Sequence, residues 1–441
     1  GASALLLPAW LGVLVTVVKQ EGRGVALFEP ASLRPGRHGL EMVNRTMPAR
    51  ERARLLTDGC DHVETLAELT QRLERGRPLR VYLGLDPTSP DLHLGHAVVL
   101  RLLQRFVDDG HDVILLIGDF TARIGDPSGR NALRPPLSDA QIDANMKTYA
   151  AQAGKVLDMA RVTLRYNSEW LSKLTFTDIY KLLSQTTVAQ MLERNDFKQR
   201  YESKSPIALH EFVYPVAVAY DSIALEVDVE LGGSDQLFNL LISRPYQVHA
   251  GQLPEICITV PLLVGLDGSK KMSKSLGNHI GLTDAPNEMF GKTMSIPDDV
   301  LPEYARLAAW WPADRVRVLK AGLLDGTVAP MDEKKRIAQD IVALYHGPDA
   351  ARAARDWFER TIQRGEIPAD MPELALDGRS KLVELIVAAG FADSKRAAQR
   401  LIAEGAVKVD GTPVTDAAAR WTATGPAVLQ VGSRKFVRIR P

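Results

Sequence analysis

The chain has 441 residues, of which 45% are hydrophobic and 24% are charged, values that are ordinary for a globular protein of about three domains. Its 54 basic and 54 acidic side chains balance, so net charge does not indicate a nucleic-acid partner, and any polyanion site must be local. The two cysteines, Cys60 and Cys257, are too few and too distant for a disulfide framework or a cysteine-based metal cluster. We therefore expect reduced thiols in a cytoplasmic protein.

Residues 1–46 differ in character from the rest of the chain. Residues 5–18 are apolar, but this run is shorter than the roughly 20 residues that span a bilayer, and Pro8 interrupts it. The first charge, Lys19, follows the run, whereas a secretory signal begins with positive charges. Acidic residues among the arginines are atypical of an organelle transit peptide. We expect a dispensable extension, disordered or artefactual, and no membrane anchor.

Regular elements are predicted from about residue 47. Residues 50–75 have the pattern of an amphipathic helix, and "LRVYLGLD" that of a short strand. Apolar side chains at positions 98, 99, 102, 103, 106 and 107 predict a helix that ends at Gly110, and "DVILLIGD" predicts a buried strand. Strand, helix and strand within about 40 residues form the unit of a parallel sheet, so we predict an α/β fold of the Rossmann type.

Helical patterns predominate in residues 138–225 and again in residues 286–362. A Pro-rich, acidic linker follows, and the tail at 380–441 then carries ten Lys or Arg against five Asp or Glu. The tail has two amphipathic helical patterns, "KLVELIVAAG" and "SKRAAQRLIAEG", followed by short strands around "AVKVDGTPV" and "RKFVRIR". A small basic α/β module of this kind is a candidate for RNA binding.

Parallel sheets bind ligands beyond the carboxyl ends of their strands, where the loops after Leu85 and Ile117 are rich in polar residues. In the first loop, "HLGH" places His93 and His96 at a strand-to-helix junction, where free backbone N–H groups favour an anion. Gly95 lacks the side chain that would block a flat ring or a phosphate. A zinc site would need a third ligand, which we cannot assign. The pattern suits a nucleoside triphosphate.

A second motif, "KMSKS", covers residues 271–275 in a loop rich in Gly, Ser and Lys. The side chains of Lys271 and Lys274 can fold over a polyphosphate and offset the negative charge that grows while pyrophosphate is displaced. A solvated surface loop would have the same composition, so the motif alone leaves both readings open.

With "HLGH" and "KMSKS" in this order, the sequence resembles the class I aminoacyl-tRNA synthetases, and from about residue 47 to 441 it is most similar to the bacterial tyrosyl-tRNA synthetases. The resemblance implies a Rossmann-like catalytic domain at 47–285, with a helical dimer-forming insertion at about 165–215. It further implies an α-helical anticodon-binding domain at 286–363, a linker at 364–379, and an RNA-binding domain at 380–441 like that of ribosomal protein S-four.

The resemblance also implies a tyrosine pocket, made of Tyr82, Asp86, Thr121, Asp126, Tyr214, Asp221 and Gln236. In this pocket Tyr82 and Asp221 stand where the family reads the phenolic hydroxyl of tyrosine. Asp126 and Tyr214 stand where it holds the α-ammonium group. Phenylalanine lacks the hydroxyl, so it would leave the buried hydrogen-bonding partner unpaired and is rejected. This family is the usual example of that principle.

The implied ATP site consists of His93, Gly95, His96, Asp235, Gln236, Lys271, Ser273 and Lys274. Asp235 matches the residue that binds the ribose, and Gln236 one near the reacting carboxylate and phosphate. The implied catalytic groups are the two histidines and the two lysines, joined by Arg130 and Arg134 on a loop that the family keeps over the pyrophosphate.

The sequence departs from the family pattern at Val218, where a glutamine commonly contacts the ammonium group and the ribose. Losing a hydrogen bond to a charged group costs about 1.5 to 3 kcal/mol, so tyrosine affinity falls unless another group substitutes. The chemistry itself needs no general base, because the carboxylate of tyrosine is already ionised near pH 7.

The implied partners are L-tyrosine, ATP with Mg²⁺, the tRNA for tyrosine and a second copy of the chain, with no tightly bound protein metal. For RNA contact in the tail we predict four basic residues, Lys395, Arg396, Arg400 and Lys408.

Three alternatives remain open on sequence. A nucleotidylyltransferase shares the histidine motif but needs neither the lysine motif nor a basic tail. A tryptophanyl enzyme fits poorly with Tyr82, Asp221 and the tail. A synthetase-derived paralogue with an RNA-binding or regulatory role would tolerate decay of both phosphate motifs, and both are intact.

Overall fold

The structure, a computed structural model, describes residues 46–127, 138–367, 371–376, 381–421, 425–432 and 435–440. In the first part of the chain a six-stranded sheet of described residues has the order β1-β6-β5-β2-β3-β4. Its strands are β1 (His62–Glu64), β2 (Arg80–Leu85), β3 (Asp112–Ile117), β4 (Val162–Tyr166), β5 (Val229–Gly233) and β6 (Ile256–Val260). Neighbouring strands are parallel, except that β1 runs antiparallel to β6.

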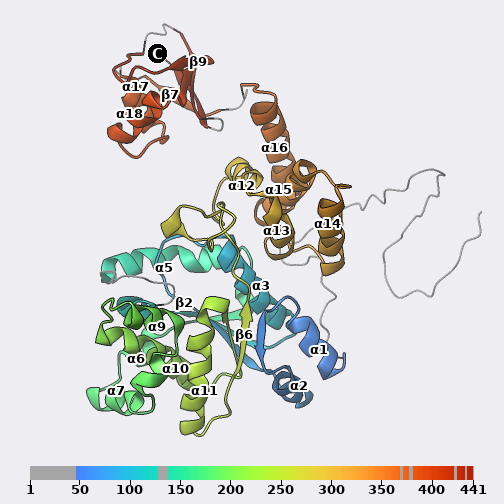
Figure 1. Cartoon of the computed structure of the whole chain (residues 1–441), viewed down its shortest axis with the longest axis vertical. Coiled ribbons are helices and arrows are strands. Elements are labelled where there is room, and N and C mark those ends of the chain that lie inside the picture. The colour runs from blue at the N-terminus through green and yellow to red at the C-terminus, as the bar shows by residue number, and fades with distance from the viewer. Residues whose placement is uncertain are drawn as a thin grey trace, which may run out of the picture. The chain divides into compact units, whose positions relative to one another are not determined.

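The central strands are apolar on both faces because helices cover both sides of the sheet. Side chains alternate along β2, so Val81 and Leu83 face the main core whereas Tyr82 packs on the opposite face with Ile114 and Leu116. Helix α3 (Leu94–Asp108) connects β2 to β3 and packs against the sheet, and α10 (Val213–Leu225) packs along α11 (Leu237–His249) (Figure 1). The predicted Rossmann-type α/β fold is confirmed.

The other helices of this part are α1 (Ala49–Leu56), α2 (Leu66–Glu74), α4 (Thr121–Ile124), α5 (Asp139–Ala153), α6 (Ser168–Leu171), α7 (Phe176–Leu183), α8 (Val188–Met191) and α9 (Asn195–Glu202). Short 3-10 turns complete it: η1 (Met159–Arg161), η2 (Leu209–Phe212), η3 (Ser234–Gln236) and η4 (Lys274–Leu276).

One prediction of secondary structure is wrong here. The single helix expected at 50–75 is interrupted after Leu56, where Gly59 has a φ of +83° that a helix does not allow, and β1 follows. The stretch 138–225 is predominantly helical, as predicted, and it also contains β4, a strand of "VTLRY" that pairs with β3.

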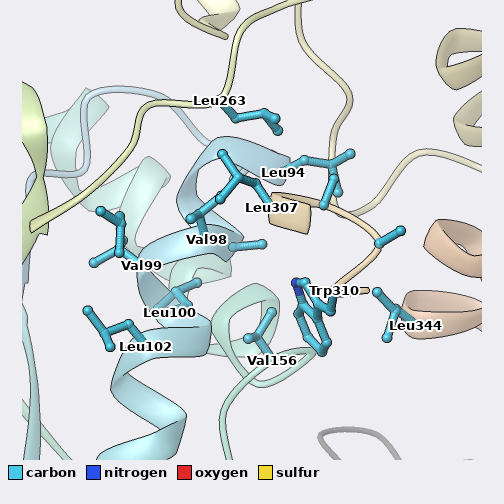
Figure 2. Close-up of a cluster of buried hydrophobic side chains, with 14 of the residues drawn as sticks. Leu94, Val98, Val99, Leu100, Leu102, Val156, Leu263, Leu307, Trp310 and Leu344 are labelled. Carbon is cyan, nitrogen blue, oxygen red and sulfur yellow. The ribbon is translucent and has the colours of Figure 1, made fainter. Parts of the chain in front are cut away.

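Residues 286–363 are mainly helical, as predicted: α12 (Pro286–Met294), η5 (Asp298–Val300), α13 (Leu301–Leu307), α14 (Ala313–Asp325), α15 (Pro330–His346), α16 (Pro348–Phe358) and the π-helical turn η6 (Glu359–Gln363). Their apolar side chains share one buried cluster with α3. Leu307 lies beside Leu94 and Val98 of α3, and Leu344 lies beside Trp310 in the same cluster (Figure 2). The helix that follows "HLGH" is therefore held from the side by the helical region.

The tail forms a second sheet of described residues, in the order β7-β11-β10-β8-β9. Its elements are β7 (Glu373–Ala375), α17 (Leu382–Ala388), α18 (Lys395–Ala403), β8 (Val407–Val409), β9 (Thr412–Val414), β10 (Ala427–Val431) and β11 (Lys435–Arg440). A separate core includes Leu385, Ile402 and Leu429. Both predicted helices are present, but β10 was not predicted, and β7, inside the predicted linker, pairs with β11.

No helix in the described part of the chain is long and apolar enough to cross a membrane.

Candidate active site

A cavity of about 410 Å³ opens at the carboxyl ends of β2 and β5. Every described residue predicted for the tyrosine and ATP sites lines it: Tyr82, Asp86, His93, Gly95, His96, Thr121, Asp126, Tyr214, Asp221, Asp235, Gln236, Lys271, Ser273 and Lys274. Arg130 and Arg134 lie outside the described residues. The two motifs, far apart in sequence, thus meet at the edge of the sheet where a Rossmann-type fold binds its ligand.

The two histidines stand at the start of α3, with His93 as the N-cap and their ring centroids 3.9 Å apart. The backbone N–H of His93 donates to Nδ1 of His96 at 3.2 Å, which leaves Nε2 of His96 to carry the ring proton. Burial lowers the pKa of His93 to about 2 and that of His96 to about 4, so both rings are neutral at pH 7. Nδ1 of His93 is buried without a hydrogen-bond partner among the described residues.

Gly95 allows the ring of His93 to pack close to the backbone at the start of α3. A Cβ atom there would lie 3.0 Å from the His93 ring and 3.7 Å from Cβ of Met272 in the lysine loop. The first distance is tighter than most contacts of a Cβ atom, so a side chain here would press on the His93 ring, whereas the second is an ordinary van der Waals distance.

Both lysines of "KMSKS" are ion-paired to carboxylates of other loops. Nζ of Lys271 lies 2.6 Å from Oδ2 of Asp235, and Nζ of Lys274 contacts Asp91. The side chains of Lys271 and Lys274 are 42% and 36% exposed, so water screens both ion pairs. A polyanion in the cavity can therefore compete for these cations.

Asp86 is the centre of the hydrogen bonds at the other end of the cavity. Its carboxylate accepts from Oγ1 of Thr121 at 2.7 Å and from the hydroxyl of Tyr214 at 3.0 Å. A Cβ at Gly118 would lie only 2.0 Å from Oδ1 of Asp86, so this glycine is required for the carboxylate to reach Thr121. Burial raises the pKa of Tyr214, which keeps its hydroxyl protonated as a donor.

Asp221 is buried at 3% exposure and held by two donors that the sequence analysis did not identify. Nε1 of Trp170 donates to it at 2.7 Å and the amide of Asn167 at 3.1 Å. Burial raises the pKa of Asp221 to about 8, against the effect of these hydrogen bonds. Asn167 also donates to Thr121 at 3.0 Å, so one chain of hydrogen bonds links Asp221 to Asp86.

Two further buried carboxyl groups lie beneath this pocket. Tyr82 of β2 is the register partner of Glu230 in β5, and its hydroxyl lies 3.1 Å from Oγ of Ser222. Glu230 and Glu255 are almost completely buried, and Oε2 of Glu230 and both carboxyl oxygens of Glu255 have no hydrogen-bond partner among the described residues. Two neighbouring buried carboxyl groups each disfavour the ionised form of the other. Burial raises the pKa of Glu255 to about 7 and, helped by Glu255, that of Glu230 well above its usual range.

Val218 lines the cavity on α10, near a second set of polar contacts. The amide of Gln236 donates to Asp126 at 2.9 Å and accepts from Asn239 at 2.8 Å. Arg194 lies 3.4 Å from the same aspartate. Asp126 is therefore positioned by groups other than residue 218.

No group of three His, Cys, Asp or Glu side chains in the described residues is arranged to hold a metal ion.

Comparisons with known proteins agree with this geometry. The sequence model of a family described as tRNA synthetases class I (W and Y) matches residues 74–363, and that of the S4 domain matches residues 380–421. The tyrosine–tRNA ligase of Moorella thermoacetica is 49% identical over 374 residues, which are 85% of this chain and 91% of that protein. The corresponding ligase of Thermotoga maritima is 47% identical over 393 residues, 89% of this chain and 98% of that protein.

The chain belongs to the tyrosyl-tRNA synthetases. Among solved structures, the Archaeoglobus fulgidus tyrosyl-tRNA synthetase complexed with L-tyrosine has a TM-score of 0.57 and 24% identity, covering 70% of this chain and 99% of that one. At this identity the likeness supports the fold alone. The predicted family is confirmed, and the tail of this tyrosyl-tRNA synthetase is an S4 domain.

Sequence reasoning missed the groups that hold the predicted residues of the synthetase in place. Trp170 and Asn167 follow β4, a strand that was not predicted, and Glu230 falls in the apolar pattern before "GGSDQ". A glutamate inside a buried strand is itself a signal, because charged residues are almost never fully buried unless they are paired.

Of the four predicted RNA-contact residues, three lie on α18 and the fourth lies on β8 of the tail sheet. Lys395, Arg396 and Arg400 are exposed, and Lys408 on β8 is half-buried. Lys395 pairs with Glu384 at 2.9 Å, and Arg400 with Glu404 at 3.6 Å.

Proposed function

We propose that the cavity activates L-tyrosine with ATP and that the tyrosyl-adenylate formed there donates its tyrosyl group to the tRNA for tyrosine. One observation carries this proposal. A single cavity is lined both by the two histidines and two lysines of the phosphate motifs and by the buried polar side chains of Tyr82 and Asp221. This arrangement can align a carboxylate with a triphosphate.

The roles of the pocket residues follow from their contacts. We assign Tyr82 and Asp221 to the phenolic hydroxyl, because both are buried polar side chains that line this side of the cavity. Asp86, Thr121, Asp126 and Tyr214 form the wall that receives the ammonium group. Tyr214 holds Asp86, and Gln236 holds Asp126, so the carboxylates are oriented before the substrate arrives.

At the phosphate end, the neutral rings of His93 and His96 offer hydrogen bonds, and Lys271 and Lys274 offer positive charge. Gly95 and Ser273 leave room for the nucleotide, and Asp235 and Gln236 reach the ribose and the reacting groups. Arg130 and Arg134 remain proposed participants. ATP enters as its Mg²⁺ complex, with the ion carried by the substrate.

In the first step an oxygen of the tyrosine carboxylate forms a bond to the α-phosphorus of ATP. The bond from that phosphorus to the bridging oxygen breaks, and pyrophosphate leaves with the electron pair. Negative charge grows on the leaving group, so lysines that already reach into the cavity stabilise the transition state more than the ground state. In the second step a ribose hydroxyl of the tRNA attacks the activated carbonyl, and AMP leaves.

The decisive test of adenylate chemistry is ATP–pyrophosphate exchange by the full chain with tyrosine, phenylalanine or tryptophan. We expect exchange with tyrosine alone, because only its hydroxyl pairs with Tyr82 and Asp221. Such a result would also show that Val218 is tolerated. Exchange driven by tryptophan, or by no amino acid, would overturn the proposal.

We further propose a homodimer that forms through the predicted insertion at about 165–215. Helix α7 has no buried residue, and several large apolar side chains of this segment are exposed, Phe176 at 84% and Val188 at 64%. Clustered exposed apolar groups of this size mark protein interfaces. In light scattering, Phe176→Glu should yield monomers, whereas Leu324→Glu, a matched change at an exposed leucine in α14, should not. A dimer in both variants would contradict this interface.

For tRNA, we propose that the helical region 286–363 recognises the anticodon and that the S4 tail contacts RNA through Lys395, Arg396, Arg400 and Lys408. Reversing Arg396 and Arg400 to glutamate should reduce tRNA charging and leave pyrophosphate exchange unchanged. The control is Arg75→Glu, an exposed arginine at the end of α2. Equal charging by variant and control would refute the tail contact.

Both cysteines are free thiols, which supports the proposed cytoplasmic location.

A further inference from the structure

A second cavity, of about 200 Å³, lies between α3, the end of α1 and the end of α13 with the segment that follows it, and shares no lining residue with the active-site cavity. Its polar lining consists of three arginines, one carboxylate and one thiol: Arg101, Arg105, Arg306, Asp58 and Cys60. The remaining walls are apolar and include Val98 and Leu307, which lie beside each other in Figure 2. None of these residues takes part in the chemistry proposed above.

The charges of this cavity are unbalanced. Three guanidinium groups face one carboxylate, that of Asp58, which leaves a surplus of two positive charges on the lining. Arg101 and Arg105 project from α3, whereas Arg306 comes from α13, so residues distant in sequence converge here. Burial lowers the pKa of Arg101 to about 9, and Arg105 adds to this effect, which shows how poorly the charge is compensated.

The hydrogen-bond donors of these arginines are also incompletely used. Nη1 of Arg105 donates to the backbone oxygen of Asp58 at 2.5 Å, but its Nε is buried without a partner among the described residues. Within the same residues no hydrogen bond or ion pair satisfies Arg101, whose guanidinium lies 4.7 Å from the centre of the Trp310 ring. Nη2 of Arg306 is 3.8 Å from Oδ1 of Asp58, too far for a hydrogen bond.

We propose that this cavity binds a phosphate group, either free or carried by a small metabolite. A phosphate monoester carries up to two negative charges and three acceptor oxygens, which match the surplus charge and the unused donors. Planar guanidinium groups bind such oxygens in pairs, and arginine is the residue that proteins prefer for this contact. The volume suits a phosphate with a few further atoms and is smaller than a site for a large ligand.

Binding here would tie α3 to α13. The same α3 begins with the two histidines of the active site, so an anion that bridges Arg101 and Arg306 would stiffen the support of that helix. Because the ligand binds the folded chain, it should also raise the melting temperature. This site goes beyond the proposed aminoacylation and does not depend on it.

The test locates the anion directly. Crystals of the full chain are soaked in tungstate, a phosphate analogue that anomalous diffraction can locate. We expect a peak within hydrogen-bond distance of Arg101 and Arg105. Anomalous peaks confined to the end of the active site that contains Lys271 and Lys274 would overturn the proposal, because they would show that the second cavity rejects the anion.

Calorimetric titration with inorganic phosphate then measures affinity in solution. Arg306→Gln, at a half-exposed position that folding should tolerate, is expected to weaken binding at this site at least about tenfold. Arg101→Met should weaken phosphate binding to a similar degree. Arg352→Gln, which removes a positive charge at an exposed position of α16, should leave the phosphate affinity unchanged. Equal phosphate affinity in all three variants would refute the site. A metabolite with a phosphate group that binds more tightly than phosphate itself would identify the metabolite as the ligand.

Discussion

The two ends of the active-site cavity are built in opposite ways. At the amino-acid end, Tyr82, Asp221 and Tyr214 are 1%, 3% and 6% exposed, and hydrogen bonds hold them before any substrate is present. A pocket of this kind is preorganised, because its polar groups are fixed by neighbours instead of by the ligand. Under the proposed function, this pocket selects tyrosine without moving.

At the phosphate end the positive groups are occupied by carboxylates that a substrate must displace. Lys271 is paired with Asp235, the residue proposed to bind the ribose, and Lys274 with Asp91. Exposed ion pairs of this type are worth only about 0.2 to 1 kcal/mol, so exchange for a triphosphate is easily driven. Under the proposed function, selection thus rests on rigid buried contacts, and catalysis rests on cations that change partners.

The largest expected effect is at a displaceable cation. Lys271→Ala should lower kcat for pyrophosphate exchange by about 100- to 1,000-fold, because one transition-state contact is lost, while KM for tyrosine changes little. Steady-state exchange kinetics would measure both. The matched control is Lys270→Ala, since the neighbouring lysine is exposed and does not line the cavity. A rise in the KM for tyrosine without a loss of kcat would contradict this role, because it would mean that Lys271 acts in binding tyrosine and not on the phosphates.

At the rigid end, Asp221→Ala should reduce kcat/KM for tyrosine by about 10- to 100-fold. The substitution removes a partner for the phenolic hydroxyl and leaves the donors of Trp170 and Asn167 unpaired, at about 1 to 3 kcal/mol. KM for ATP, measured in the same exchange assay, is the internal control and should stay constant. Unchanged kinetics with tyrosine would show that Asp221 does not bind the phenolic hydroxyl.

The buried carboxyl groups of this end also predict a dependence of stability on pH. Glu230, Glu255 and Asp221 have pKa values raised by burial, so the folded chain holds protons that the unfolded chain has lost above about pH 4.5. Their contribution is complete below that pH and is lost as the pH rises through about 7 for Glu255 and about 8 for Asp221. Stability must therefore fall toward alkaline pH.

Glu230→Gln should flatten this decline by up to about 1.4 kcal/mol per pH unit between pH 6 and 9, because one titrating proton is removed. Chemical denaturation at several pH values would measure the slope. The matched control, Glu74→Gln at an exposed position of α2, should keep the slope of the original chain. An equal slope in Glu230→Gln would mean that this glutamate is ionised in the folded state.

Sequence patterns predicted those features of the active site that are encoded in contiguous stretches of the chain. The apolar runs of β2 and β3, the helix between them, and both phosphate motifs stand in contiguous stretches, and the Rossmann rule then places their loops together. The pairing of Tyr82 with Glu230 could not be predicted in this way, because it depends on the register between β2 and β5. Trp170 was missed for a related reason, since the short strand before it has no strong pattern.

The smallest expected effect tests whether the carboxylates of the phosphate end really compete with ATP. Asp91→Asn removes the charge that holds Lys274, and Asp91 is 40% exposed, so the lost pair is weak. We expect KM for ATP to fall about two- to fivefold with little change in KM for tyrosine. A higher KM for ATP would have the opposite meaning: Asp91 would then position Lys274 for the phosphates, and the phosphate end would be preorganised like the tyrosine pocket.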